Sequence, residues 1–310
     1  MGRQLRLHRK VRLRCRRVFG KSALRLLMDW FRPCEQRRVG IHGVLMALLV
    51  SAFISGCQSP SASLQQLADE HHRQMQILPG QPFPLIALLP PETFRAARLR
   101  VYLEGDGHAW ATATQPSLDP SPRKLLVPSL AINDPTPNAY LARPCQFIKV
   151  AACNPALWTH RRFSLEVVSS ISQALDQLKH RYGNREFELI GYSGGATLAL
   201  LIAAQRDDVT GVQTLAGNLD PTQWAKTKSL SPLSGSLDPL DYTQRLALIP
   251  QRHFSGAGDE MIPTELAERY NRLLGNTACS QLIIVAGATH ETGWEEAWKV
   301  WRGLEFAGCK

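Results

Sequence analysis

Short apolar runs alternate with longer apolar or amphipathic segments along the second half of the chain. The short runs predict strands over residues 99–103, 186–190, 209–215, 252–255 and 281–285. The longer segments predict helices over residues 164–182, 196–204, 264–274 and 294–304. Strands that alternate with helices are typical of a mostly parallel sheet that is covered by helices on both faces. The pattern therefore predicts an α/β fold.

The composition adds a bound on the number of domains. The chain has 310 residues, of which 44% are hydrophobic and 20% are charged, and this excludes a disordered chain and a membrane protein with several spans. Pro and Gly cluster at residues 79–91 and 114–137, but neither cluster is long enough to link two domains. One folded domain over residues 75–310 is therefore expected.

The net charge of +10 comes from the first forty residues. Of the 36 basic and 26 acidic residues, 13 and 2 lie there, and residues 41–57 carry neither kind, which leaves 23 basic and 24 acidic residues from Gln58 onward. A nucleic-acid-binding domain carries its basic excess on the folded body. We therefore expect no nucleic-acid partner.

An apolar run over residues 43–56 follows the basic stretch and ends at Cys57. The run is shorter than the roughly 20 residues of a transmembrane helix, and its length suits the apolar part of a secretory signal. Its end, Ile54-Ser-Gly-Cys57, resembles the lipobox of bacterial lipoproteins. The alternative is a signal anchor that happens to end in cysteine.

The lipobox resemblance implies three things about the protein. Residues 1–56 are a leader that is cleaved off, and Met28 is an alternative start for it. Cys57 carries acyl chains, and residues 57–74 form a lipidated cysteine and a polar tether. The domain is then held in the bacterial envelope, at the outer membrane and facing the periplasm, so that the membrane is one of its partners.

Four cysteines lie beyond the leader, namely Cys145, Cys153, Cys279 and Cys309. Four cysteines allow three pairings, and we favour Cys145–Cys153 with Cys279–Cys309 because each pair is close in sequence and none is left over. A metal site is the competing interpretation. The spacings contain no Cys-x-x-Cys pair, so disulfides are expected and a metal is not.

A candidate nucleophile lies in the segment Gly191-Tyr-Ser-Gly-Gly195, which contains the pattern G-x-S-x-G. The segment stands between a predicted strand and a predicted helix, as a nucleophile elbow requires, and its glycines leave space where the strand and the helix nearly touch. The alternative is a glycine-rich turn with no catalytic role. We predict that Ser193 is the nucleophile.

A serine nucleophile needs a base, and in the elbow topology the acid and then the histidine follow it along the chain. His290 comes just after a predicted strand, whereas His253 lies inside one and is interpreted as a packed or edge residue. Asp259 also follows a strand directly, and Asp220 has the same position one strand earlier. We predict the catalytic set Ser193, Asp259 and His290, with Asp220 as the alternative acid.

Such a site also needs two backbone N–H groups that stabilise an oxyanion. Gly194 follows the nucleophile and is the first candidate. The second lies in the loop after residues 99–103, which carries Gly105, Asp106 and Gly107. The glycines of this loop are not those of a dinucleotide-binding turn, because Trp110 stands where a third glycine is needed. No cofactor is expected.

Five stretches give the chain a resemblance to the α/β-hydrolase superfamily and, more narrowly, to uncharacterised bacterial envelope lipoprotein hydrolases. They cover residues 102–110, 140–146, 158–164, 191–195 and 216–220. The resemblance implies an α/β-hydrolase fold and a small-molecule or lipid acyl substrate. It does not choose the substrate, because the superfamily includes esterases, lipases, peptidases and relatives without activity.

The leading hypothesis is a serine hydrolase of carboxylic esters that works through an acyl-enzyme. One alternative is a non-catalytic binding lipoprotein of the envelope on the same fold. Another is an acyltransferase that uses the same three residues with a different acceptor. The acyl chain length, the oligomeric state and a lid over the site are not specified by the sequence.

Overall fold

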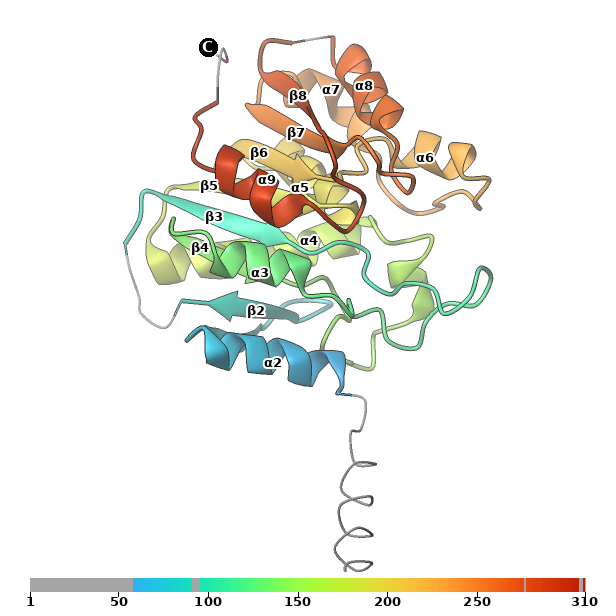
Figure 1. Ribbon diagram of the computed structural model, residues 1–310. Coiled ribbons are helices and arrows are strands. Elements are labelled where there is room, and N and C mark those ends of the chain that lie inside the picture. Colours follow the sequence, from blue (N-terminus) through green and yellow to red (C-terminus); the bar gives the residue numbers. More distant parts are fainter. Residues whose placement is uncertain (1–57, 91–94, 276, 307–308, 310) are drawn as a thin grey trace, which may run out of the picture. The chain divides into compact units, whose positions relative to one another are not determined.

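An eight-stranded sheet runs through the part of the chain that the computed structural model describes, which is residues 58–90, 95–275, 277–306 and 309 (Figure 1). Its strands are β1 Gln74–Leu78, β2 Leu85–Leu89, β3 Arg98–Leu103, β4 Asn138–Leu141, β5 Glu186–Tyr192, β6 Val209–Leu215, β7 Gln251–Gly256 and β8 Ser280–Val285. They lie in the order β1-β2-β4-β3-β5-β6-β7-β8. Strands β3 to β8 are all parallel to one another, β2 is antiparallel to β4, and β1 is antiparallel to β2. The prediction of a mostly parallel α/β sheet is confirmed.

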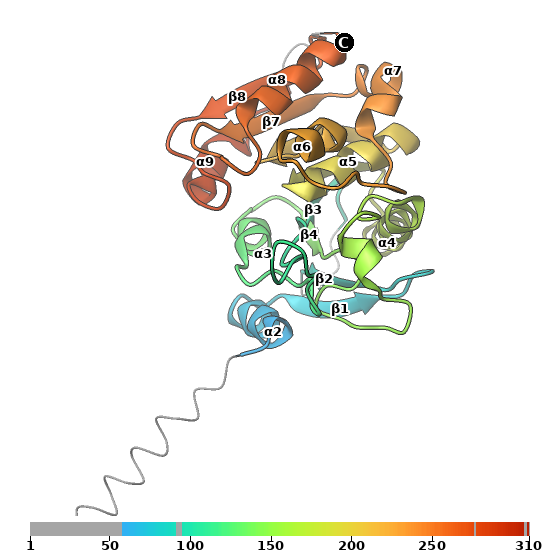
Figure 2. The ribbon, with the colours of Figure 1, turned by 90° about the vertical axis from the view of Figure 1, so that its right-hand side faces the viewer.

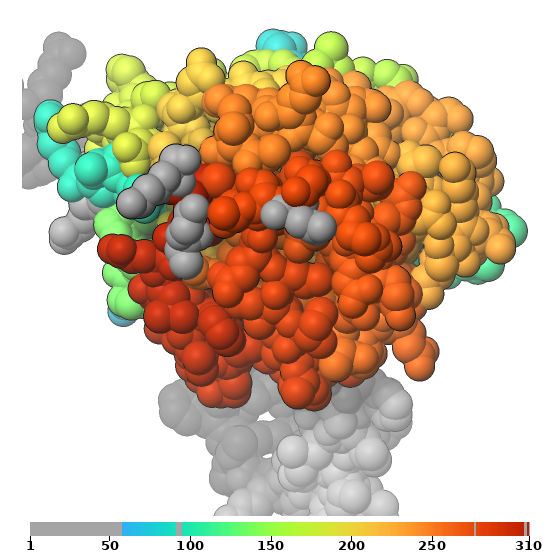
Figure 3. Space-filling view, turned by 90° about the horizontal axis from the view of Figure 1, so that it is seen from above, coloured from blue at the N-terminus to red at the C-terminus, as the bar shows by residue number. Residues whose placement is uncertain are grey.

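Helices cover both faces of this sheet. They are α2 Pro60–Glu70, α3 Leu126–Ile132, α4 Leu165–Tyr182, α5 Gly194–Gln205, α6 Pro221–Thr227, α7 Thr243–Leu246, α8 Thr264–Leu273 and α9 Trp294–Trp301, with short 3₁₀ turns at Pro155–Trp158 and Pro239–Tyr242. One core cluster contains buried residues of α4, α5 and α8, and the other contains those of α2, α3 and α9. Figure 2 shows the two groups on opposite sides of the sheet. Figure 3 views the domain from the β8 edge of the sheet, where C-terminal segments form most of the visible surface.

The two central helices differ in pattern because they differ in burial. In α5, every residue from Gly194 to Ala203 is buried, so its sequence is apolar on all sides. In α4 only one face is buried, and the helix is amphipathic. Helix α4 ends at Gly183, whose φ of 65° is a left-handed conformation that glycine adopts without strain.

The structure differs from the sequence prediction at the N-terminal end of the domain. The segment expected to be a polar tether over residues 57–74 is helical over Pro60–Glu70. Ser59 caps this helix by accepting a hydrogen bond from the N–H of Ala62, and Leu64 and Ala68 are fully buried. These two residues lie four positions apart, so they share one face of the helix, and that face belongs to the core cluster that contains residues of β2 and β4. The leader, the lipobox segment and Cys57 lie outside the described residues.

Both expected disulfides are present, Cys145–Cys153 and Cys279–Cys309. They close loops of 8 and 30 residues, and bonds of this kind stabilise a domain by about 2–4 kcal/mol each. The first lies beside the loop that follows β4, and the second ties the C-terminal residues to the start of β8. Within the described residues, no helix has the length and apolar character needed to cross a membrane.

Candidate active site

Ser193 lies in a sharp turn between β5 and α5. Its φ of 51° and ψ of −120° are rare for a residue with a side chain, which is the strained geometry of a nucleophile elbow. The turn depends on its glycines: a Cβ on Gly191 would lie 2.5 Å from the carbonyl oxygen of Gly195, and one on Gly195 would lie 2.4 Å from that of Leu103. The turn therefore has no space for larger residues at these two positions.

The structure brings the three predicted catalytic side chains into one hydrogen-bonded chain. His290 Nε2 lies 3.1 Å from Ser193 Oγ, and His290 Nδ1 lies 2.9 Å from Asp259 Oδ2. The second oxygen of Asp259 accepts the backbone N–H groups of Met261 and Ile262. The Asp259 side chain is fully buried, whereas 20% of the His290 side chain is exposed. A carboxylate at Nδ1 favours the tautomer in which Nε2 can accept the serine proton.

The carboxyl ends of three parallel strands place these residues together, with β6 lying between β5 and β7 in the sheet. Ser193 follows β5, Asp259 follows β7 and His290 follows β8. The last two loops contact one another directly, because Gly258 N–H donates to the carbonyl of Ala288 at 2.9 Å. This is the edge of an open α/β sheet at which ligands usually bind.

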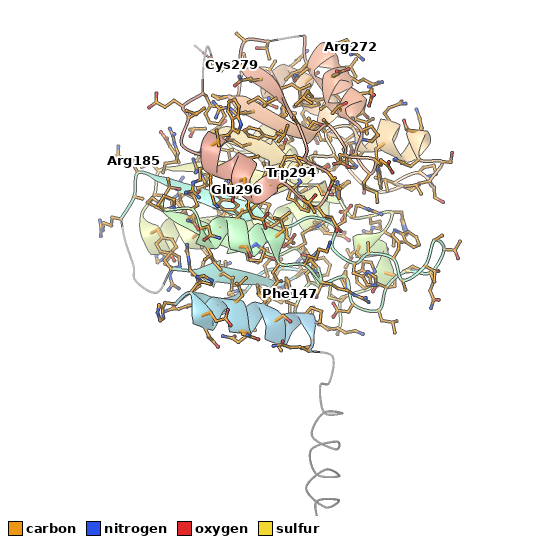
Figure 4. The ribbon with its side chains drawn as sticks, in the orientation of Figure 1. Phe147, Arg185, Arg272, Cys279, Trp294 and Glu296 are labelled. Atoms are coloured by element: carbon orange, nitrogen blue, oxygen red, sulfur yellow. A yellow bond between two sulfur atoms is a disulfide. The ribbon has the colours of Figure 1, made fainter. Side chains whose placement is uncertain are left out.

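Two aromatic residues that the sequence argument did not select hold the histidine loop. The hydroxyl of Tyr192 donates to the carbonyl oxygen of His290 at 2.8 Å. Trp294, the first residue of α9 (Figure 4), donates its indole N–H to the same oxygen at 3.0 Å. Burial raises the pKa of the Tyr192 hydroxyl, so this residue stays protonated and keeps donating. The position of Tyr192 beside Ser193 in the elbow is a sequence feature that could have identified it. No sequence feature points to Trp294.

The alternative acid is engaged elsewhere. Asp220 caps α6 by accepting the N–H of Gln223 at 2.9 Å, and its other oxygen pairs with Arg269 at 2.6 Å. His253 is buried in β7 as expected, between Thr214 and Gln251, and burial lowers its pKa to about 3. It is therefore a neutral packed residue at ordinary pH.

The candidate oxyanion donors lie around the elbow. Gly194 is the first residue of α5, so its N–H has no acceptor within the helix. In the loop after β3, the N–H of Gly105 donates to the side chain of Glu104 at 2.9 Å, and is therefore already used. Asp106 approaches the elbow closely, because a Cβ on Gly194 would lie 2.2 Å from its carboxylate. Gly107, with a φ of 63°, packs against the carbonyl of Pro120.

Two carboxyl groups of this loop differ in charge: Glu104 is buried, and Asp106 is partly buried. Burial raises the pKa of Asp106, but Arg162 and Arg143 outweigh it and hold that pKa below its usual range. Glu104 has weaker partners, and burial raises its pKa to about 7 against the opposing effects of Gly105 N–H, Tyr140 and Arg143. The hydroxyl of Tyr140 donates to Glu104 at 2.8 Å. Asp106 is thus ionised at neutral pH, and Glu104 titrates there.

No family model and no curated protein matches the chain. Its fold, however, is similar to that of many solved structures. An esterase of Pyrococcus furiosus superposes with a TM-score of 0.55 at 11% identity, over 76% of this chain and 90% of the other. A dienelactone hydrolase of Klebsiella pneumoniae, described as putative, has a TM-score of 0.51 at 15% identity, over 74% and 95%. An alpha-beta serine hydrolase homologue of Coxiella burnetii has a TM-score of 0.51 at 13% identity, over 75% and 97%.

These similarities establish the fold: the chain has the α/β-hydrolase fold, as its resemblance to that superfamily implied. In this fold a nucleophile, an acid and a histidine follow one another in that order along the chain. The predicted set of this chain has the same order.

Proposed function

We propose that the protein is a serine hydrolase that cleaves carboxylic esters through an acyl-enzyme. The observation that supports this most is the hydrogen-bonded chain from Asp259 through His290 to Ser193, with Ser193 in a strained elbow. A packed histidine or a capping serine needs only one such contact, whereas nucleophilic catalysis needs all of them at once.

In the first half of the reaction, Ser193 Oγ attacks the acyl carbon of the ester and His290 Nε2 takes the serine proton. The negative charge that develops on the carbonyl oxygen is stabilised by the N–H of Gly194 and by a second backbone N–H from the loop that follows β3. His290 then gives its proton to the alkoxide oxygen as the bond between the acyl carbon and that oxygen breaks. An alcohol leaves, and Ser193 carries the acyl group.

In the second half, His290 takes a proton from water, and the resulting oxygen nucleophile attacks the acyl carbon. The bond to Ser193 Oγ breaks, the serine recovers its proton from His290, and a carboxylic acid is released. Asp259 remains ionised throughout and holds the imidazole in one orientation. These side chains supply the whole reaction without a cofactor.

Labelling with a fluorophosphonate tests this proposal, using the full chain purified from bacterial envelopes in mild detergent. We expect a single adduct on Ser193, and none after Ser193→Ala or after the protein is unfolded. Ser170→Ala is a matched control, because Ser170 is a buried serine of α4 whose hydroxyl donates to the carbonyl of Glu166 in the same helix. Folded protein that takes no label and hydrolyses no short- or long-chain p-nitrophenyl ester would contradict the proposal and favour a binding protein.

We also propose that acyl chains on Cys57 anchor the domain in the envelope. The support is the apolar run and the lipobox-like end of the leader. Replacement of Cys57 by Ser should release the protein from the membrane fraction or leave the leader uncleaved. If the variant stays membrane-bound with the mass of the wild-type mature protein, the cysteine is not the anchor.

A further inference from the structure

A buried ion cluster lies beside the elbow and takes no part in the reaction described above. The carboxylate of Asp106 lies between two guanidinium groups: Arg162 Nη1 is 2.7 Å from Oδ2, and Arg143 Nη1 bonds Oδ1. The arginine side chains are each only 5% exposed, and that of Asp106 is 19% exposed. We refer to these three residues as the Asp106 cluster.

The two arginines are themselves held from several sides. Arg162 donates through Nε to the carbonyl of Thr159 at 2.6 Å, and its guanidinium lies 5.7 Å from the ring centre of Trp224. Arg143 donates to the carbonyl of Arg162 and lies 5.4 Å from the ring centre of Phe163. Hydrogen bonds and cation–π contacts together restrict the position of each guanidinium group. The carboxylate of Asp106 therefore meets a pre-arranged pair of donors.

Stability alone is a poor explanation for the Asp106 cluster. It buries two cations with one anion, and the cost of desolvating buried charges often exceeds their attraction. Moreover, burial lowers the pKa of Arg143, which means that the site disfavours this charge. A cluster of this composition is expected where it orients a group whose position matters.

The Asp106 cluster orients the loop that follows β3, and this loop lies against the elbow. Gly105 is held on one side, because its N–H donates to Glu104 and its carbonyl accepts from Gln146 at 3.0 Å. The Asp106 cluster holds the next residue, whose carboxylate lies against Gly194. Among the described residues, the N–H groups of Asp106 and Gly107 have no protein acceptor. Of these two residues, Asp106 is the one that lies against Gly194, whereas Gly107 lies against Pro120.

We propose that the side chain of Asp106 is a positioning residue for the oxyanion hole. Clamped by Arg143 and Arg162, it keeps the peptide N–H of Asp106 in place beside Gly194. The inference rests on the proposed function, since it assigns the second donor of that reaction. It also gives the two arginines a role that requires no contact with the substrate.

The test compares Asp106→Asn with Asp134→Asn, a buried aspartate that pairs with Arg100 at a distance from the elbow. For folded Asp106→Asn we expect kcat on a p-nitrophenyl ester to fall about 10- to 100-fold, since loss of an entire oxyanion donor costs roughly 100- to 1000-fold. We expect KM to change much less. The inhibition constant of a boronic acid, which forms a tetrahedral adduct with a serine, should rise in parallel with the loss in kcat/KM. Folded Asp134→Asn should keep both values.

Each outcome decides the matter. If folded Asp106→Asn keeps wild-type kcat and boronate affinity, or if Asp134→Asn loses as much of both, the positioning role is refuted. If Asp106→Asn does not fold, Arg162→Lys decides in the same assays, because it keeps the charge but loses the fork that joins Asp106 to Thr159. Wild-type protein that takes no fluorophosphonate and hydrolyses no ester would refute the proposed function and this inference with it, which the variants alone cannot do.

Discussion

Two ion clusters of opposite composition lie along β3 and the loop that follows it. Within the strand, Arg100 lies between two carboxylates, 2.8 Å from Asp134 and 3.1 Å from Glu188. Three residues beyond the strand's end, Asp106 lies between two arginines. The first set, which we call the Arg100 cluster, has one cation and two anions, and the Asp106 cluster has the reverse.

The two clusters differ in the structural elements that they connect. Glu188 belongs to β5 and also accepts from Gln213 of β6 at 2.6 Å, so the Arg100 cluster ties neighbouring strands. Asp134 accepts from the hydroxyl of Tyr102, which in turn accepts from Trp298 of α9 at 2.7 Å. The Asp106 cluster instead joins three loops. The same kind of interaction thus ties secondary structure in one place and positions a loop in the other.

We expect the largest effects at the proposed catalytic residues, where substitutions should remove most of the activity and leave the stability nearly unchanged. Ser193→Ala and His290→Ala should each lower kcat by about 10⁴- to 10⁶-fold. The double variant should be scarcely worse than either one, because the residues act as a unit. Thermal unfolding should remain close to that of the wild type, since the side chains lie in loops at strand ends. Steady-state kinetics and calorimetry of the three variants check this.

The two candidate acids sharpen the same prediction. Asp259→Asn should lower kcat less than loss of His290, because the imidazole keeps some basicity without its partner. Asp220→Asn, which removes the charge that pairs with Arg269, should leave kcat largely intact. If Asp220→Asn abolishes turnover while Asp259→Asn has almost no effect, the acid follows β6 and the assignment to Asp259 is wrong.

The Arg100 cluster should give the opposite separation. Removal of the charged end in Arg100→Met leaves Asp134 and Glu188 buried without their cation, and breaking a buried pair costs about 3–5 kcal/mol. Urea unfolding should show this loss, while kcat per folded molecule stays at the wild-type value. A large fall in kcat at unchanged stability would show that the two clusters do not differ in role.

Glu104 gives the smallest effect, and it depends on pH. Burial raises the pKa of this carboxyl to about 7 from its ordinary value of 4.5, so folding favours its protonated form. The stability gained from protonation is fully present below pH 4.5 and is lost as the pH rises through about 7. Glu104→Gln cannot ionise, and its stability relative to the wild type should therefore rise by about 1–3 kcal/mol between pH 5 and pH 8.

Unfolding in urea at a series of pH values measures this difference. Three groups face the carboxyl, namely the N–H of Gly105, the hydroxyl of Tyr140 and the charge of Arg143, and all of them favour ionisation. In a Tyr140→Phe background, the transition should therefore move to higher pH. A stability difference that stays constant from pH 5 to pH 8 would mean that Glu104 does not titrate in this range.

Local signals were enough to predict the central strands and to select three side chains that the structure brings together, Ser193, Asp259 and His290. Strands β3, β5, β6, β7 and β8 were each placed within two residues at either end. The glycine pattern around Ser193 is local to one turn, and the positions of Asp259 and His290 follow from the ends of strands. Parallel strands bring such ends together whatever the loops contain.

The features that were missed depend on distant partners or lack a period. Strand β2, Leu85–Leu89, is buried at all five positions, and so short an apolar run shows no alternation that distinguishes it from a helix. The Asp106 cluster joins residues 37 and 56 positions apart. An arginine in a loop is usually solvated, so nothing local marked Arg143 or Arg162 as partners of Asp106.

The central claim is that Ser193 carries the acyl group during turnover. Its most direct measurement mixes the protein with a slow ester substrate, quenches the mixture in acid within the first turnovers and maps the acyl mass by peptide mass spectrometry. We predict one acylated peptide, with the acyl group on Ser193, that is absent from Ser193→Ala and disappears as the substrate is exhausted. Continued ester turnover by Ser193→Ala, or an acyl group on another residue of the active wild-type protein, would contradict the account.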